Sequence, residues 1–175
     1  MSTAVTLPST GRSGGRLGTA PPVHAAGMIQ DPPILLPPRW HRTSDPGRGI
    51  VVAARQASLP PSGVRPELVL CRTGVEDSLT AWRARALAGL AELLDAFELE
   101  DEDDVEVDGR DAAYRRFAHR HGLADVVSEQ WAWLVDGVGV TLTCTVARED
   151  YADYCDVFEA VAETVEPERV GLTGS

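Results

Sequence analysis

The chain contains no lysine and no asparagine, and all sixteen of its basic residues are arginine. Without lysine, a phosphate-binding loop of the Walker type is excluded, because that loop needs a lysine for the phosphates. Enzymes that form a Schiff base through a lysine amine are excluded as well. Codon usage in a GC-rich genome is the simplest explanation of the bias, and both exclusions hold whatever its cause.

Cysteine is also scarce. The chain has three cysteines, an odd number, and no two of them have CxxC spacing: Cys71, Cys144 and Cys155. This pattern favours reduced thiols over a disulfide framework or a zinc site. We therefore expect a cytoplasmic protein.

Long apolar segments are missing too. The sequence has no run of about 18 apolar residues, so no membrane span is predicted, and the first thirty residues lack the apolar core of a secretory signal. The net charge of −11 argues against binding to nucleic acid or anionic membranes, because phosphate binding relies on clustered cations. No cofactor is predicted.

Enough apolar sequence is present for one domain, since 43% of the 175 residues are hydrophobic. Residues 1–31 are mainly Gly, Ser, Thr, Pro and Ala and are predicted to be a disordered tail. Residues 32–168 are predicted to form the domain, and residues 169–175 a flexible C-terminus. Met28 is an alternative start of translation, which leaves the translated extent of the tail open.

The first half of the domain combines strands with one helix. The apolar run 34–36 is stopped by two prolines, which predicts an edge strand or an extended lead-in before Trp40. Strands are predicted over 50–55 and 68–72. A helix begins at Asp77 or Ser78. Its apolar stripe consists of Leu79, Trp82, Ala86, Leu90, Leu93 and Phe97, and Arg83, Arg85 and Glu92 lie off it.

The second half has the period of strands. Asp108-Gly109 and Asp136-Gly137 are hairpin signals that predict an antiparallel meander between residues 97 and 147. Its last strand, 138–147, places Val140, Leu142, Cys144 and Val146 on one face. A helix follows from about 149 to 165, and Pro167 ends it. The predicted fold class is α+β, an antiparallel sheet flanked by helices.

Acidic residues are concentrated in two segments. Eight of the 27 lie between Glu98 and Asp108, and eight more between 149 and 168. The run Asp101–Asp104 suggests a calcium loop, but the turn glycine is missing and Ala112 stands where the bidentate glutamate belongs. A solvated connection between strands is the preferred interpretation.

Histidines and tryptophans supply the remaining candidates for a site. His119 and His121 share a strand face that would suit a metal, but no third ligand is indicated, and plain surface residues are the simpler interpretation. Trp131 and Trp133 also share a face, either as core beneath a helix or as a platform for a partner. With Trp40, at the start of the domain, they are the predicted partner-binding residues. No catalytic or metal-binding set is predicted, and no nucleophile elbow is present.

Four segments of the domain carry a family resemblance. They are the LPPRW sequence at 36–40, the acidic strand at 97–110 that ends in Asp-Gly-Arg, the hairpin at 130–145 and the terminal helix at 150–167. They resemble the LPxGW motif, acidic strand, last hairpin and terminal helix of the DcrB-related family. The resemblance covers roughly residues 32–168.

This resemblance implies a Mog/PsbP-like α/β/α sandwich and a non-enzymatic binding function. One branch of the family consists of chaperones that shield apolar helices of effectors exported by type VI secretion, and another of envelope lipoproteins. The chain departs from the second branch because it has no lipoprotein box, and no branch-specific residues assign it to the first.

We therefore predict a non-enzymatic, cytoplasmic binding or adaptor protein whose partner is a protein, such as a secreted effector or its apolar helix. Binding would use a sheet face or edge near Trp40 or the strand of Trp131 and Trp133, with the acidic terminal helix attracting a basic partner or keeping the complex soluble. Two alternatives remain: a small-molecule-binding domain with a pocket between helix and sheet, and a metal-dependent enzyme centred on His119 and His121. The oligomeric state stays open, a homodimer included.

Overall fold

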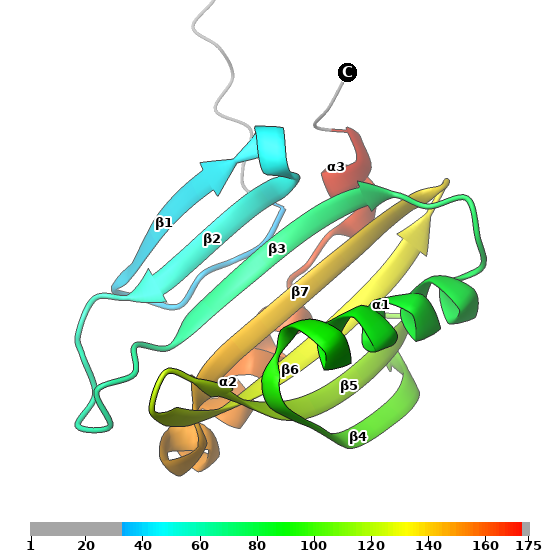
Figure 1. Cartoon of the computed structure of the whole chain (residues 1–175). Coiled ribbons are helices and arrows are strands. Elements are labelled where there is room, and N and C mark those ends of the chain that lie inside the picture. The colour runs from blue at the N-terminus through cyan, green and yellow to red at the C-terminus, as the bar shows by residue number, and fades with distance from the viewer. Residues whose placement is uncertain (1–32, 173–175) are drawn as a thin grey trace, which may run out of the picture. The chain divides into compact units, whose positions relative to one another are not determined.

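The computed structural model describes residues 33–172. Within them, seven strands form one antiparallel sheet in the order β1-β2-β3-β7-β6-β5-β4 (Figure 1). The strands are β1 (Trp40–Asp45), β2 (Ile50–Gln56), β3 (Glu67–Gly74), β4 (Asp95–Val107), β5 (Arg110–His121), β6 (Ala124–Val135) and β7 (Val138–Ala147). The predicted tail at 1–31, with Met28, lies outside the described residues, as do residues 173–175.

Helices cover both faces of this sheet. Helix α1 (Leu79–Leu93) follows β3, and α2 (Tyr151–Ala162) and α3 (Pro167–Leu172) follow β7. Two short 3-10 turns, η1 (Pro46–Arg48) and η2 (Arg148–Asp150), precede β2 and α2. Figure 1 shows α1 on one face of the sheet and α2 on the other. The predicted α+β fold class is confirmed.

Both Asp-Gly hairpins form as predicted. Asp108 and Gly109 join β4 to β5, and Asp136 and Gly137 join β6 to β7. All four residues have positive φ, from 49° to 77°. This is the type I′ conformation, whose twist matches that of the paired strands.

The main core lies between the sheet and helices α2 and α3. Alternate residues of the central strands point to this face, and Val140, Leu142, Cys144 and Val146 of β7 are fully buried there. The two helices contribute Phe158, Val161, Ala162 and Val170. This face of the sheet therefore holds most of the buried apolar surface.

Helix α1 covers the opposite face, and its buried residue is not the predicted one. Ser78 caps the helix, because its Oγ accepts a hydrogen bond from the amide of Ala81 at 3.2 Å. The buried side chain is that of Arg83, which lies off the apolar stripe, whereas Leu93 on the stripe is 83% exposed. The stripe was misleading because the sheet beneath α1 presents the polar side chain of Gln130, to which Arg83 donates a hydrogen bond.

Residues 34–36 form no strand and belong to the lead-in before β1, which is one of the two predicted alternatives. Two further segments differ from the predictions. The run Asp101–Asp104 lies inside β4, not in a connection, and in the strand register Asp101 and Glu102 are opposite Arg116 and Arg115 of β5. Pro167 begins α3, a position that proline tolerates in a helix, so residues 169–172 are helical instead of flexible.

The three cysteines are free thiols. Cys144 is fully buried, and burial raises the pKa of its thiol well above the ordinary value. Among residues 33–172, no helix is long and apolar enough to cross a membrane.

Candidate functional site

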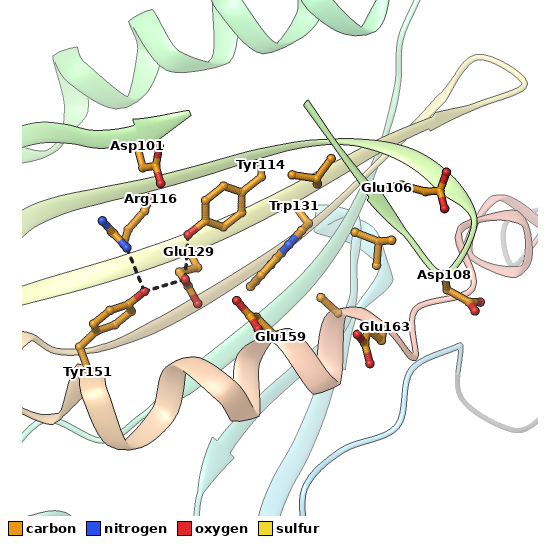
Figure 2. Close-up of a pocket in the computed structure, with 13 residues that line it drawn as sticks. Asp101, Glu106, Asp108, Tyr114, Arg116, Glu129, Trp131, Tyr151, Glu159 and Glu163 are labelled. Carbon is orange, nitrogen blue, oxygen red and sulfur yellow. Dashed lines mark hydrogen bonds between the residues drawn. The ribbon is translucent and has the colours of Figure 1, made fainter. Parts of the chain in front are cut away.

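A groove of about 410 Å³ lies beside α2 and the β4–β5 hairpin, on the face of the sheet that holds the core (Figure 2). We call it the acidic groove. Its lining residues are aromatic or aliphatic on the floor and mostly acidic at the rim: Asp101, Val105, Glu106, Val107, Asp108, Tyr114, Arg116, Glu129, Trp131, Tyr151, Glu159, Ala162 and Glu163.

Adjacent strands β5 and β6 place the aromatic floor, Tyr114 and Trp131, beside the charged side chains of Arg116 and Glu129. Tyr114 lies opposite Trp131, and Arg116 lies opposite Glu129. Since side chains alternate along a strand, these four residues point to the same face. The rings of Tyr114 and Trp131 are tilted against each other with their centroids 5.4 Å apart, an arrangement that stabilises aromatic pairs.

Glu129 is the most deeply buried acid of the groove, with 2% of its surface exposed. Its Oε1 accepts hydrogen bonds from the hydroxyls of Tyr114 and Tyr151, both at 2.8 Å (Figure 2). Its Oε2 is covered and has no hydrogen-bond partner within the described part of the chain. Burial raises the pKa of the Glu129 carboxyl, and the two hydroxyl bonds offset only part of that effect.

Arg116 carries the one positive charge of the lining. Its Nη1 donates to the Tyr151 hydroxyl at 3.3 Å, and its Nε donates to Glu100 at 3.1 Å. The hydrogen bond to Tyr151 is the main cause that raises the pKa of Arg116, so the guanidinium stays charged. Burial raises the pKa of Tyr151 to about 12, so its hydroxyl keeps its proton near neutral pH. Glu100 balances the charge of Arg116 from outside the groove.

The rim carries further carboxylates. Asp108 forms an ion pair with Arg110 at 2.7 Å. Asp101, Glu106, Glu159 and Glu163 form no ion pair with any residue of the described range. The groove is therefore electronegative above an apolar floor, which suits a ligand that combines a cation with apolar groups.

The predicted tryptophans do not form one site. Trp131 and Trp133 are 4% and 2% exposed, on the face of β6 that holds the core. Trp131 also lines the acidic groove. Trp40 is half-buried at the start of edge strand β1 and is separated from β6 by β2, β3 and β7.

The predicted histidine pair lies on the other face of the sheet. His119 and His121 line a second cavity of about 510 Å³, together with Arg55 and Arg65. Burial, and to a lesser extent the charge of His121, lowers the pKa of His119. Across residues 33–172, no group of three or more His, Cys, Asp or Glu side chains is arranged to hold a metal ion.

Sequence reasoning missed Glu129, Tyr114 and Arg116. A signal for Glu129 exists, because it is a single acid within the otherwise apolar or neutral stretch 126–134. An acid in such a strand is seldom buried without a partner. The partner hydroxyl of Tyr151 comes from another element and has no local signature.

No protein family model matches the chain, and no curated protein sequence matches it. Solved structures do match. They include PA94 of Pseudomonas aeruginosa, a protein of unknown function (16% identity, 75% of this chain and 88% of that one, TM-score 0.59). LpqN of Mycobacterium tuberculosis, involved in cell envelope biogenesis, matches at 12% identity over 74% of this chain and 79% of that one, with a TM-score of 0.59.

The third is CyanoP, the cyanobacterial PsbP of Synechocystis, at 16% identity over 86% of this chain and 98% of that one, with a TM-score of 0.55. Identities this low show the fold alone. The chain therefore has the PsbP-like α+β fold that its sequence predicted.

Proposed function

We propose that the chain is a non-catalytic, cytoplasmic binding protein that holds a segment of a protein partner in the acidic groove. The observation that carries this proposal is the composition of the groove, an aromatic and aliphatic floor below unpaired carboxylates. The floor offers apolar contact area for affinity, and the carboxylates steer a partner of opposite charge and suppress wrong ones.

The lining also supports binding over catalysis. It contains no Ser, Thr, Cys or His, so the aliphatic hydroxyl, thiol and imidazole groups that serve as nucleophile or general base in many enzymes are missing from it. Tyr114, Tyr151 and Arg116 are held by hydrogen bonds to one another or to glutamates. This network fixes the orientation of the side chains around the Glu129 carboxylate.

The resemblance to the DcrB-related family supports the finer part of the proposal. We propose membership of that family and, within it, a chaperone role for an apolar helix of a secreted effector. Helix-in-groove binding is the recognition mode that this requires. The sheet and α2 would form the groove, and the acidic residues of α2 would keep the complex soluble.

Peptide selection on the intact chain tests the proposal. A phage library of random twelve-residue peptides is selected on the immobilised protein, and enriched peptides are studied by hydrogen–deuterium exchange. We expect slower amide exchange in α2 and in the β4–β5 hairpin of the complex. Failure to enrich any peptide, or protection confined to β1 and β2, would contradict the proposal.

A small-molecule ligand is the second candidate, favoured by one observation. The groove lies between helix and sheet, and its volume of about 410 Å³ falls within the range of ligand sites. A thermal-shift screen of small organic amines separates the two candidates. A bound amine that raises the melting temperature, while no selected peptide protects the groove, would favour the small molecule.

A further inference from the structure

The covered oxygen of Glu129 sets the acidic groove apart from an ordinary acidic surface. The side chain exposes 2% of its surface, yet its Oε2 accepts no hydrogen bond from the described residues. Buried polar atoms are nearly always paired, and each exception calls for an explanation. Figure 2 shows the carboxylate between Tyr114 and Tyr151, facing the side of the groove formed by α2.

We infer that the acidic groove receives an arginine side chain of the partner segment, whose guanidinium donates a hydrogen bond to Oε2 of Glu129. The inference rests on the proposed function and names the chemistry that the partner must bring. The arginine stem and the apolar residues beside it would lie along Tyr114 and Trp131, which form the floor. Because Oε2 is covered in the free chain, the carboxylate or a lining side chain rotates as the ligand enters.

Charge favours a cation over any other occupant. Four rim carboxylates, Asp101, Glu106, Glu159 and Glu163, have no ion-pair partner in the described range. The Arg116 guanidinium does not take this place, since it is bound to Glu100 and to the Tyr151 hydroxyl. A ligand cation would enter the negative potential of the rim before it reaches Glu129.

The aromatic floor favours arginine. A guanidinium is planar, is more weakly hydrated than an ammonium ion and stacks on aromatic rings. The tilted rings of Tyr114 and Trp131 form an apolar surface beside the acceptor. Its several N–H donors would satisfy Oε2 and a rim carboxylate of α2 together, as charge-assisted hydrogen bonds.

The test uses a matched pair of peptides on the intact chain. Each has nine residues, is acetylated and amidated, and carries two leucines on either side of a central position. That position is arginine in one peptide and citrulline, the uncharged isostere, in the other. Affinities are measured by calorimetry in about 0.15 M salt, where charges beyond about 8 Å are screened. Competition with a groove-binding peptide from the phage selection locates the binding.

We expect the arginine peptide to bind at least about tenfold more tightly than the citrulline peptide. Glu129→Gln should remove most of that difference, and Glu159→Gln with Glu163→Gln should reduce it. The matched control, Asp153→Asn with Asp156→Asn, removes the same charge from α2 outside the lining and should leave both affinities unchanged. If Glu129→Gln fails to fold, the double variant Glu159→Gln with Glu163→Gln, which changes only the exposed rim, still tests the inference.

Two results would overturn the inference and spare the proposed function. One is groove binding in which arginine and citrulline peptides have equal affinity. The other is an arginine preference that is unchanged in folded Glu129→Gln and in the rim variant. Absence of any peptide from the groove would instead contradict the proposed function.

Discussion

Arg115 donates a hydrogen bond from its Nη2 to the backbone carbonyl of Arg83 at 2.9 Å, so β5 is joined to α1 by one arginine that reaches the backbone of another. The two side chains are 1% and 4% exposed. Neither forms an ion pair with a carboxylate of residues 33–172. Burial, followed by the charge of Arg115, lowers the pKa of Arg83 to about 9.

Replacing Arg83 with methionine is expected to leave stability unchanged or raise it by about 1 kcal/mol. The substitution removes a buried, unpaired charge and keeps most of the apolar stem, which outweighs the lost hydrogen bond to Gln130. Urea unfolding at neutral pH measures the change. Arg85→Met, whose side chain is exposed and pairs with Asp77, is the control and should lie within about 0.5 kcal/mol of the original chain. A loss above about 1 kcal/mol in Arg83→Met would show that the guanidinium is paired in solution. Glu102 is the candidate partner, because its charge raises the pKa of Arg83.

Glu129 should make stability fall as pH rises through the raised pKa of its carboxyl. Burial raises its pKa in the folded chain above the value in the unfolded chain. The folded chain therefore binds the proton more tightly, and the associated stability is complete below the unfolded pKa and lost as pH rises through the folded one. The hydroxyls of Tyr114 and Tyr151 and the charge of Arg116 oppose this shift, and Glu159 adds to it.

The pH effect is measured as a difference between variants. Unfolding free energies of the original chain and of Glu129→Gln are compared at several pH values, and Glu129→Gln should gain relative to the original as pH rises. Glu106→Gln, which removes a carboxylate from the exposed rim, should show no such gain. Parallel pH profiles for the original chain and Glu129→Gln would refute the prediction.

Gly139 is expected to tolerate no side chain. A Cβ at this position would lie 2.5 Å from the indole ring of Trp82 and 2.7 Å from Val75. Gly139→Ala should therefore push α1 away from β7 and cost about 1–3 kcal/mol. Gly89→Ala is the matched control, because that position in α1 has open space and alanine stabilises a helix interior by about 0.5–1 kcal/mol. Thermal unfolding of both variants checks the opposite signs.

The thiols should differ in reactivity. Cys144 is fully buried and burial raises its pKa strongly, whereas Cys71 and Cys155 are only partly buried. Because the thiolate is the reactive form, iodoacetamide at pH 8 should modify Cys155 first, Cys71 more slowly because burial raises the pKa of its thiol, and Cys144 only when the chain unfolds. Mass spectrometry of the digested protein follows the three sites. Modification of Cys144 at the rate of Cys155 would show that the core opens readily.

The sheet was largely predictable because its signals are local. Each Asp-Gly pair determines a hairpin from two adjacent residues, and the strand predicted over 138–147 coincides with β7. The N-cap at Ser78 can also be recognised locally, because its hydrogen-bond partner lies within the first turn of the helix. Such features depend on neighbours in the sequence, so one sequence suffices to find them.

The candidate site was less predictable because its contacts join distant elements. Glu129 is recognised as buried only when Tyr114 of β5 and Tyr151 of α2 are placed beside it, which requires the sheet order and the position of α2. Helical periodicity placed Arg83 off the apolar stripe, because periodicity registers hydrophobicity and ignores hydrogen-bond partners such as Gln130. The sequence could not decide whether Trp133 is a core residue or part of a platform for a partner. Both roles place alternate residues of the strand on one face, so they give the same sequence pattern.

The sheet has two unlike ends. At one end, the edge strand is β4, which carries the acidic residues Asp101–Asp104. If two copies of the chain paired through this strand, their carboxylates would be brought together. Charged outer strands are a common protection against indefinite strand addition and aggregation. At the other end, β1 spans only Trp40–Asp45, and its inner neighbour is β2. Charge therefore opposes the addition of a strand at β4, and the shortness of β1 limits the hydrogen bonds that an added strand could form at the other end.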